Sequence, residues 1–182
     1  MQEEDTPVHN YVYSSEMVAF VKTANVYCTF LEELKGNEGR TFILESVKHL
    51  SAVYSGFLDT GESEPVLETP NESTVTEQEW STIFQQISMI LGPYNDVLRM
   101  ANEGEFDRSE LVNHTISEDL SDLYQELRDF TVVYSRGVEE FMNDAAWELS
   151  VRFTEHWGAK LLRALQALHA LYASGVDPTE KE

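Results

Sequence analysis

Three acidic residues between positions 117 and 135 have the spacing of a ligand-binding face on a helix. At about 100° per residue, Asp119, Asp122 and Glu126 fall within about 60° of one another. Carboxylates held this close repel one another unless solvent, basic side chains or a divalent cation compensates their charge. The spacing therefore has two interpretations: a solvated acidic face, or part of a magnesium site like those of all-helical nucleotide pyrophosphohydrolases.

A second set of polar residues follows and supplies positive charge. Glu148, Arg152 and His156 recur at intervals of four on a helix that is otherwise largely apolar. If this helix packs antiparallel to the first, Arg152 or His156 would meet the three carboxylates and leave a small polar pocket between the helices. The candidate polar cluster is Asp119, Asp122, Tyr124, Glu126, Glu148, Arg152, His156 and Trp157.

The sequence leaves the role of this cluster open. A buried polar network fixes the register of two helices in some proteins and binds a small ligand or a metal in others. A two-helix magnesium site needs a second acidic helix, and Asp144 with Glu148 is the nearest equivalent, without a third member. We therefore assign no catalytic residue, metal or cofactor from the sequence.

Other kinds of reaction centre lack their motifs. The sequence contains no Gly-x-Ser-x-Gly elbow and no Gly-x-x-x-x-Gly-Lys phosphate loop. Cys28 is the only cysteine, which excludes an internal disulfide and a zinc site built from several thiolates. His156 and His169 lie about 220° apart on a straight helix, so they are not expected to share a ligand.

Apolar residues recur at helical spacing from Met17 to Tyr172, which predicts an all-α fold. Thr76 and Glu79 form a capping box that opens a helix, and Gly92 ends it. Helices are expected at 15–35, 41–58, 77–91, 117–135 and 138–173, with a short helix or turn at 95–101 and mostly loop over 102–115. These elements fit one domain over residues 1–182, an irregular bundle of five or six helices with short disordered termini.

The charge of the chain is strongly negative and unevenly distributed. It has 33 Asp and Glu against 12 Lys and Arg, a formal net charge of −21. Such a field repels phosphate backbones and anionic lipids, so neither nucleic acid nor a membrane is expected as a partner. Residues 59–79 hold seven acids and no Lys or Arg, which predicts an exposed acidic loop over about 59–75.

The N-terminus predicts a cytoplasmic location. Residues 1–5 are acidic and lack the basic and apolar regions of a signal peptide. No apolar run approaches the ~20 residues that a helix needs to span a bilayer.

Residues 117–169 also carry a combined motif. Its parts are Glu118-Asp-Leu-Ser-Asp122 with Tyr124, then Trp147, His156-Trp-Gly158, Ala164-Leu165 and Ala167-Leu-His169. The motif resembles an uncharacterised bacterial all-helical family, the DUF5063-like domain of unknown function. The resemblance implies an all-helical bacterial protein and implies no reaction. Glu118, Gln125 and Lys160 stand where members often have Asp, Arg and His, so a family site that used the last two positions would be altered here.

The sequence favours an interaction or adaptor role, because an acidic helical surface suits a protein partner. The enzyme alternative is a divalent-metal hydrolase that uses Asp119, Asp122 and Glu126, with Glu148 and His156 facing them. A third alternative is an acidic nucleic-acid mimic, which is less favoured because the charge is concentrated in one loop. The sequence indicates no substrate, specific partner or oligomeric state.

Overall fold

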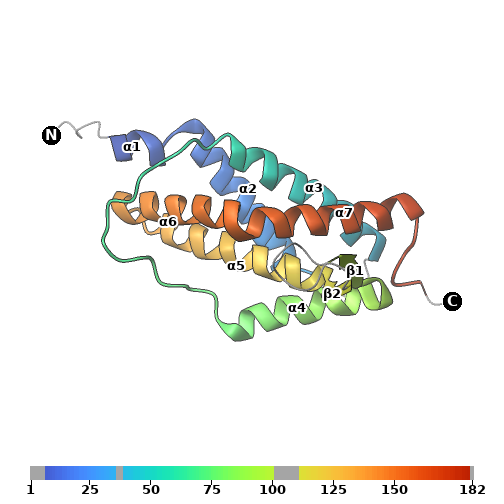
Figure 1. The fold of residues 1–182 in the computed structure, drawn as a ribbon. Helices are drawn as coiled ribbons and strands as arrows, with labels where there is room; N and C mark the ends of the chain where they lie inside the picture. The colour runs from blue at the N-terminus through green and yellow to red at the C-terminus, as the bar shows by residue number, and fades with distance from the viewer. Residues whose placement is uncertain (1–6, 36–38, 101–110, 181–182) are drawn as a thin grey trace.

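The computed structural model describes residues 7–35, 39–100 and 111–180 (Figure 1). Its main elements are α1 (Pro7–Val12), α2 (Ser15–Glu32), α3 (Gly39–Leu58), α4 (Glu77–Leu91), β1 (Asp96–Met100), β2 (Leu111–Thr115), α5 (Ile116–Ser135), α6 (Glu139–Arg152) and α7 (Gly158–Ser174). A short 3-10 helix, Gly92–Tyr94, follows α4, and a π-helical turn, Phe153–Trp157, joins α6 to α7. The prediction of an all-α irregular bundle is confirmed.

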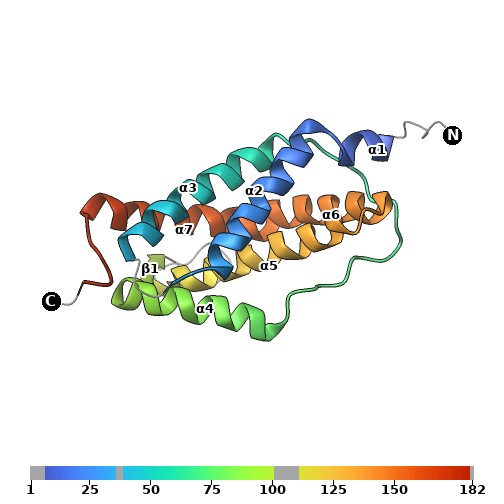
Figure 2. The same ribbon diagram turned by 180° about the vertical axis from the view of Figure 1, so that it is seen from behind.

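Helix α5 lies at the centre of the bundle and contacts α2, α4, α6 and α7, while α3 packs on α2 and α7 (Figure 1 and Figure 2). The apolar stripe of α5 faces the core: Leu120, Leu123 and Leu127 are fully buried, Phe130 nearly so, and Tyr134 packs partly against the core. Because α5 touches helices on several sides, several of its polar residues, such as Asp119 and Asp122, lie at helix interfaces.

The starts of α4 and α5 follow the sequence signals. Thr76 accepts a hydrogen bond from the backbone N–H of Glu79, and the Glu79 carboxylate accepts one from the backbone N–H of Thr76, which completes the predicted capping box. The Thr115 side chain caps α5 by accepting from the backbone N–H of Glu118. These caps fix where the two helices begin.

The predicted continuous helix over 138–173 is interrupted by the π-helical turn. Within this turn Thr154 is exposed and Trp157 is buried. A π turn accommodates one extra residue, so every side chain after it rotates relative to a straight α-helix. Gly158 suits this turn, because a Cβ atom there would come within 2.6 Å of the Phe153 carbonyl oxygen.

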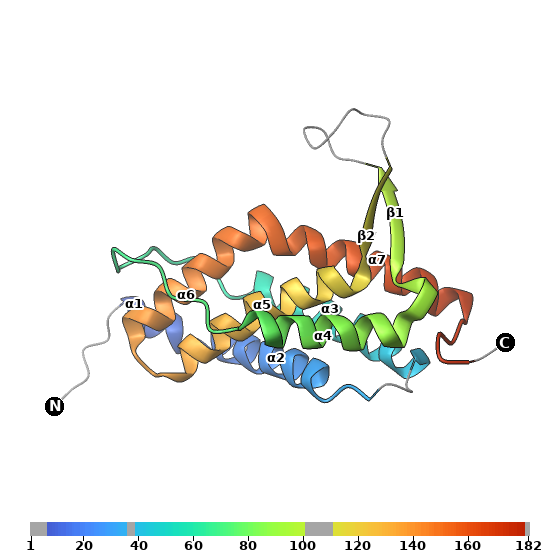
Figure 3. The ribbon, with the colours of Figure 1, turned by 90° about the horizontal axis from the view of Figure 1, so that it is seen from below.

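The segment after α4 forms a β-hairpin where a short helix or turn at 95–101 and mostly loop were expected. Strands β1 and β2 pair antiparallel, with Asp96 opposite Thr115 and Met100 opposite Leu111. Figure 3 shows the hairpin projecting from the bundle beside α7. Strand pairing depends on contacts between distant residues, which local apolar spacing does not report. Residues 101–110, part of the expected loop, lie outside the described residues.

The base of the hairpin is fastened to α5 by Asn95. Its side-chain amide donates to Ser117 Oγ at 2.9 Å, and its Oδ1 accepts from the Ser117 backbone N–H at 2.9 Å. The Asn95 carbonyl oxygen accepts from the Ile116 backbone N–H. A buried amide satisfied in this way sets the direction in which the hairpin leaves the bundle.

Helix α1 was not expected from the sequence. His9 Nδ1 lies 2.7 Å from Glu139 Oε1 on α6, and Tyr134 Oη donates to the Val12 carbonyl oxygen at 2.6 Å. These contacts hold α1 at the α5–α6 end of the bundle. The termini expected to be disordered, residues 1–6 and 181–182, lie outside the described residues.

Candidate functional site

Helix α5 and the α6–α7 segment run antiparallel, and ion pairs cross the interface at three levels. Arg152 Nη1 lies 3.1 Å from Glu126 Oε2, and Arg163 Nη2 lies 2.7 Å from Asp119 Oδ1. Between these pairs, Lys160 Nζ contacts Asp122 Oδ2. Each of the three carboxylates that could have formed a metal-binding face is therefore compensated by a basic side chain.

The pair of Asp119 and Arg163 is the most buried of the three. The Asp119 side chain is only 4% exposed, and Arg163 binds it in a bidentate manner through Nη2 and Nε. His114 Nε2, at the end of β2, lies 3.5 Å from Asp119 Oδ2. One carboxylate thus links the hairpin, α5 and α7.

Asp122 is bound from two sides. Its Oδ1 accepts a hydrogen bond from Trp80 Nε1 on α4 at 2.9 Å, while Lys160 contacts its Oδ2. This arrangement joins α4 and α7 through α5.

Three members of the expected cluster lie elsewhere. The Tyr124 hydroxyl donates to Glu32 Oε1 on α2 at 2.9 Å, and Trp157 is buried with Nε1 donating to the Leu149 carbonyl oxygen. The His156 side chain is 64% exposed, and the acid beside it is its neighbour Glu155. Of the two residues expected to meet the α5 carboxylates, Arg152 contacts Glu126 and His156 does not, because His156 lies within the π turn that interrupts the expected continuous helix.

The expected acidic loop is tied to the helices in the structure. We call residues 59–76, between α3 and α4, the acidic strap; it runs around the outside of α6 and α5 (Figure 1 and Figure 3). The buried carboxylate of Asp144 accepts from the backbone N–H groups of Val66 and Leu67, each at 2.8 Å. Asn143 Nδ2 donates to the Glu64 carbonyl oxygen at 2.8 Å. Side chains of α6 thus fix the first half of the strap.

Two further carboxylates fix its second half. Glu148 Oε1 accepts from the Asn71 backbone N–H at 2.8 Å, and Asp129 Oδ1 accepts from the backbone N–H groups of Thr74 and Val75 at 2.6 and 2.8 Å. Hydrogen bonds from amides to charged carboxylates are stronger than neutral ones. The strap backbone is therefore held at several points along its length.

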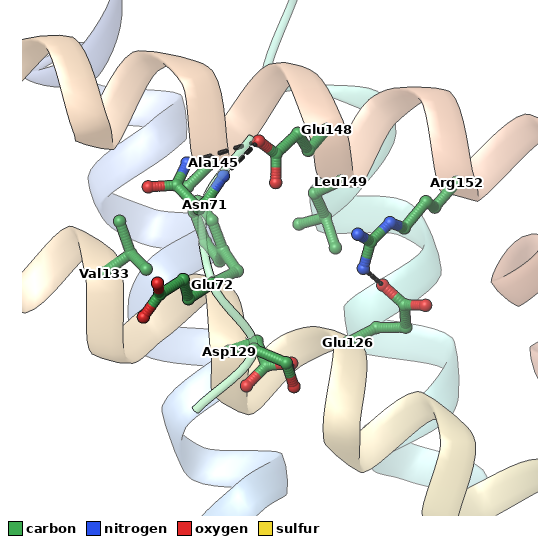
Figure 4. A pocket seen from close by; sticks show the side chains of 11 residues that line it. Asn71, Glu72, Glu126, Asp129, Val133, Ala145, Glu148, Leu149 and Arg152 are labelled. Carbon is green, nitrogen blue, oxygen red and sulfur yellow. Dashed lines mark hydrogen bonds and ion pairs between the residues drawn. The ribbon is translucent and has the colours of Figure 1, made fainter. Parts of the chain in front are cut away.

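A small cavity of about 40 Å³ lies between the strap, α5 and α6 (Figure 4). Glu126, Glu148 and Arg152 of the candidate cluster line it, together with Glu72 and Asp129. A polar cavity of this size has room for ordered water and little more. Partial burial acts to lower the pKa of Arg152, but the nearby carboxylates, Glu126 first among them, raise it overall, so the guanidinium stays charged.

The acids of the candidate cluster already have partners within the protein. Within residues 7–35, 39–100 and 111–180, no three His, Cys, Asp or Glu side chains are grouped so that they could hold a metal ion. The charged groups of the cluster are used in contacts between helices or with the strap. Carboxylates in such contacts have fewer free lone pairs for a cation.

Several residues at this interface were not identified from the sequence. They are Trp80, His114, Asp129, Lys160 and Arg163. Their partners lie on other elements, and helical periodicity carries no information on such distant pairs. Arg163 alone has a local signal, because it falls near Arg152 on the polar face of a straight helix.

No helix in the described part of the chain has the length and apolar character needed to cross a membrane. The comparison with curated proteins gives no match. The crystal structure of protein BF1032 from Bacteroides fragilis is similar, with 27% sequence identity and a TM-score of 0.78. The alignment covers 89% of this chain and 98% of that one. The sequence matches the family described as a domain of unknown function, DUF5063, over residues 11–174. The chain therefore belongs to the DUF5063 family.

Proposed function

We propose that this protein is an interaction module whose acidic strap docks a basic segment of a partner protein. The observation that carries the proposal is the attachment of the strap backbone to Asp129, Asp144 and Glu148. A segment of this composition is usually mobile. Here it is held in one path, with the side chains of Glu62, Glu64, Glu68 and Glu72 exposed along it.

The electrostatics support a docking role. The chain has a net charge of −21, and the carboxylates of Asp129, Asp144 and Glu148 lie beneath a segment that is itself acidic. Their mutual repulsion with the strap glutamates opposes folding. The same carboxylates fix the strap backbone, so the exposed glutamates are held in defined positions. A partner then binds a row of charges that is already ordered, so less conformational entropy is lost on association. Complementary charge also speeds the encounter with a basic surface.

The two alternatives have weaker support. A divalent-metal hydrolase would need carboxylates that are free to bind a cation, whereas Asp119, Asp122 and Glu126 each contact a basic side chain. An acidic nucleic-acid mimic would also bind a basic protein surface. It would differ from a docking module because it would displace DNA or RNA from that surface. The single, buried Cys28 is consistent with the cytoplasmic location that we propose.

Fluorescence anisotropy tests the proposal by measuring the affinity of two charge-matched variants for a labelled peptide of Lys and Gly. The strap variant carries Glu62→Gln, Glu64→Gln, Glu68→Gln and Glu72→Gln. The control variant carries four substitutions at exposed acids elsewhere, Glu33→Gln, Glu118→Gln, Glu140→Gln and Glu155→Gln. Both variants have the same net charge, so any difference in their affinity for the peptide must come from where the four substitutions lie.

We expect the strap variant to bind the peptide about tenfold more weakly than the wild type, because four exposed pairs contribute a few tenths of a kcal/mol each. The control variant should lose much less affinity. Added salt should weaken wild-type binding, since exposed charges are screened. Equal losses in the two variants would mean that the peptide responds only to net charge, and the docking role would then be abandoned.

A further inference from the structure

A groove of about 490 Å³ lies beside the first half of the strap. Its apolar lining comes from Pro7, Val8 and Tyr11 of α1 and from Val66 of the strap. Two acids, Glu62 and Glu64, also line the groove. It therefore combines an apolar lining with negative charge, which differs from the polar cavity between α5 and α6.

The strap backbone beside this groove is bound to α6 by hydrogen bonds. The backbone N–H of Val66 donates to Asp144, and the carbonyl oxygen of Glu64 accepts from Asn143. Although its backbone is fixed on both sides, Val66 remains 49% exposed. Val66 is not isolated, because it lines the same groove as Pro7, Val8 and Tyr11, and an apolar groove rimmed by polar groups is a common binding site for an apolar group.

We propose that this groove receives one apolar side chain, such as leucine or phenylalanine, flanked by Lys or Arg in the partner segment. The inference rests on the proposed docking function and names the chemistry of its partner. Charge complementarity selects this occupant: Glu62 and Glu64 favour cations beside the apolar group. The N-terminal residues of this chain are a poor match, because Glu3, Glu4 and Asp5 carry the wrong sign.

Two peptides of equal charge test the inference by isothermal titration with the full-length chain. One contains only Lys and Gly, and the other has a central Leu in place of one Gly. We expect the Leu peptide to bind the wild type about tenfold more tightly, as burial of a leucine side chain allows. Val66→Ser and, independently, Val8→Ser should each remove most of this gain. Val26→Ser, at an exposed valine on α2, is the matched control and should keep it.

The outcomes separate the inference from the function on which it rests. If the Lys–Gly peptide binds and the central Leu adds nothing, the groove is not an anchor site, and the docking function stands. If neither peptide binds, the docking function itself fails. If Val26→Ser loses the gain as fully as Val66→Ser and Val8→Ser do, the effect is not local to the groove and the inference is overturned. Melting temperatures of the three variants check that each is folded.

Discussion

The carboxylate of Asp119 differs from those of the other acids of α5. It is buried, and it accepts hydrogen bonds from Nε and Nη2 of Arg163. Loss of the arginine would leave a buried charge without its partner, which is among the most destabilising changes in proteins. We expect Arg163→Ala to lower the free energy of unfolding by about 3–5 kcal/mol. Urea denaturation measures this change.

His156→Ala is the matched control for that experiment. The His156 side chain is largely exposed, so its removal should change stability by less than about 0.5 kcal/mol. A double variant, Asp119→Leu with Arg163→Leu, should recover much of the stability lost in Arg163→Ala, because it leaves no unpaired charge. Equal stability of Arg163→Ala and the wild type would show that the pair contributes nothing.

The buried thiol of Cys28 makes the free energy of unfolding depend on pH in the alkaline range. Burial raises the pKa of its thiol from 9.0 to about 12, although Arg128 acts in the opposite direction. Above pH 9 the unfolded chain loses this proton while the folded chain keeps it, so the free energy of unfolding should fall as pH rises from 9 towards 12.

Alkylation followed by mass spectrometry gives the complementary measurement on Cys28. In the folded protein near neutral pH, iodoacetamide should leave the thiol unmodified, since the thiolate is the reactive form and the side chain is buried. Reaction should begin only when urea unfolds the chain. Fast modification of the native protein would contradict this assignment.

At the scale of elements, the strap depends on Asp144, which accepts two backbone hydrogen bonds. Asp144→Asn replaces one acceptor oxygen with a donor and removes the charge. We expect a loss of about 1–3 kcal/mol in the free energy of unfolding and faster cleavage of the strap by a glutamate-specific protease. Asp59→Asn, at an exposed acid of the same strap, is the control, because it makes the same chemical change and leaves every glutamate in place. Unchanged cleavage of Asp144→Asn would show that these bonds do not hold the strap.

The π-helical turn gives a second prediction at this scale. A Cβ atom at Gly158 would lie 2.6 Å from the Phe153 carbonyl oxygen, so Gly158→Ala must displace the backbone and should cost about 1–3 kcal/mol. Gly56→Ala is the matched control, because its Cβ would meet nothing closer than Phe20 at 3.7 Å. There the better helix propensity of alanine should stabilise the protein by about 0.5–1 kcal/mol. Thermal unfolding compares the two; a neutral Gly158→Ala would argue against the tight turn.

These elements also mark the limit of prediction from this sequence. Apolar spacing and the capping box at Thr76 are local signals, and they predicted the long helices and the start of α4. The hairpin, the π turn and the strap contacts depend on residues far apart in the chain. For the candidate site, spacing predicted the acidic face and the approach of Arg152, but the π turn decides that Lys160 meets Asp122 while His156 does not.

At the scale of the whole molecule, a net charge of −21 means that mutual repulsion opposes folding. Salt screens this repulsion over about 10 Å at 0.1 M ionic strength, whereas the buried pair of Asp119 and Arg163 is screened much less. We therefore expect the melting temperature to rise as sodium chloride is added. The four-site strap variant should show a smaller rise, because it carries less charge. A melting temperature that falls with salt would show that exposed ion pairs outweigh the repulsion.

The π turn between α6 and α7 also has an evolutionary consequence. A π turn takes up one residue more than the α-helical turn it replaces, so the helical register after it is unchanged by that extra residue. A family member with one residue fewer between positions 153 and 157 could therefore pass from α6 into α7 as a straight helix, and the residues equivalent to Lys160 and Arg163 would still face α5. The same deletion between Lys160 and Arg163 has no π turn to absorb it, and it would rotate Arg163 away from Asp119 by about 100°.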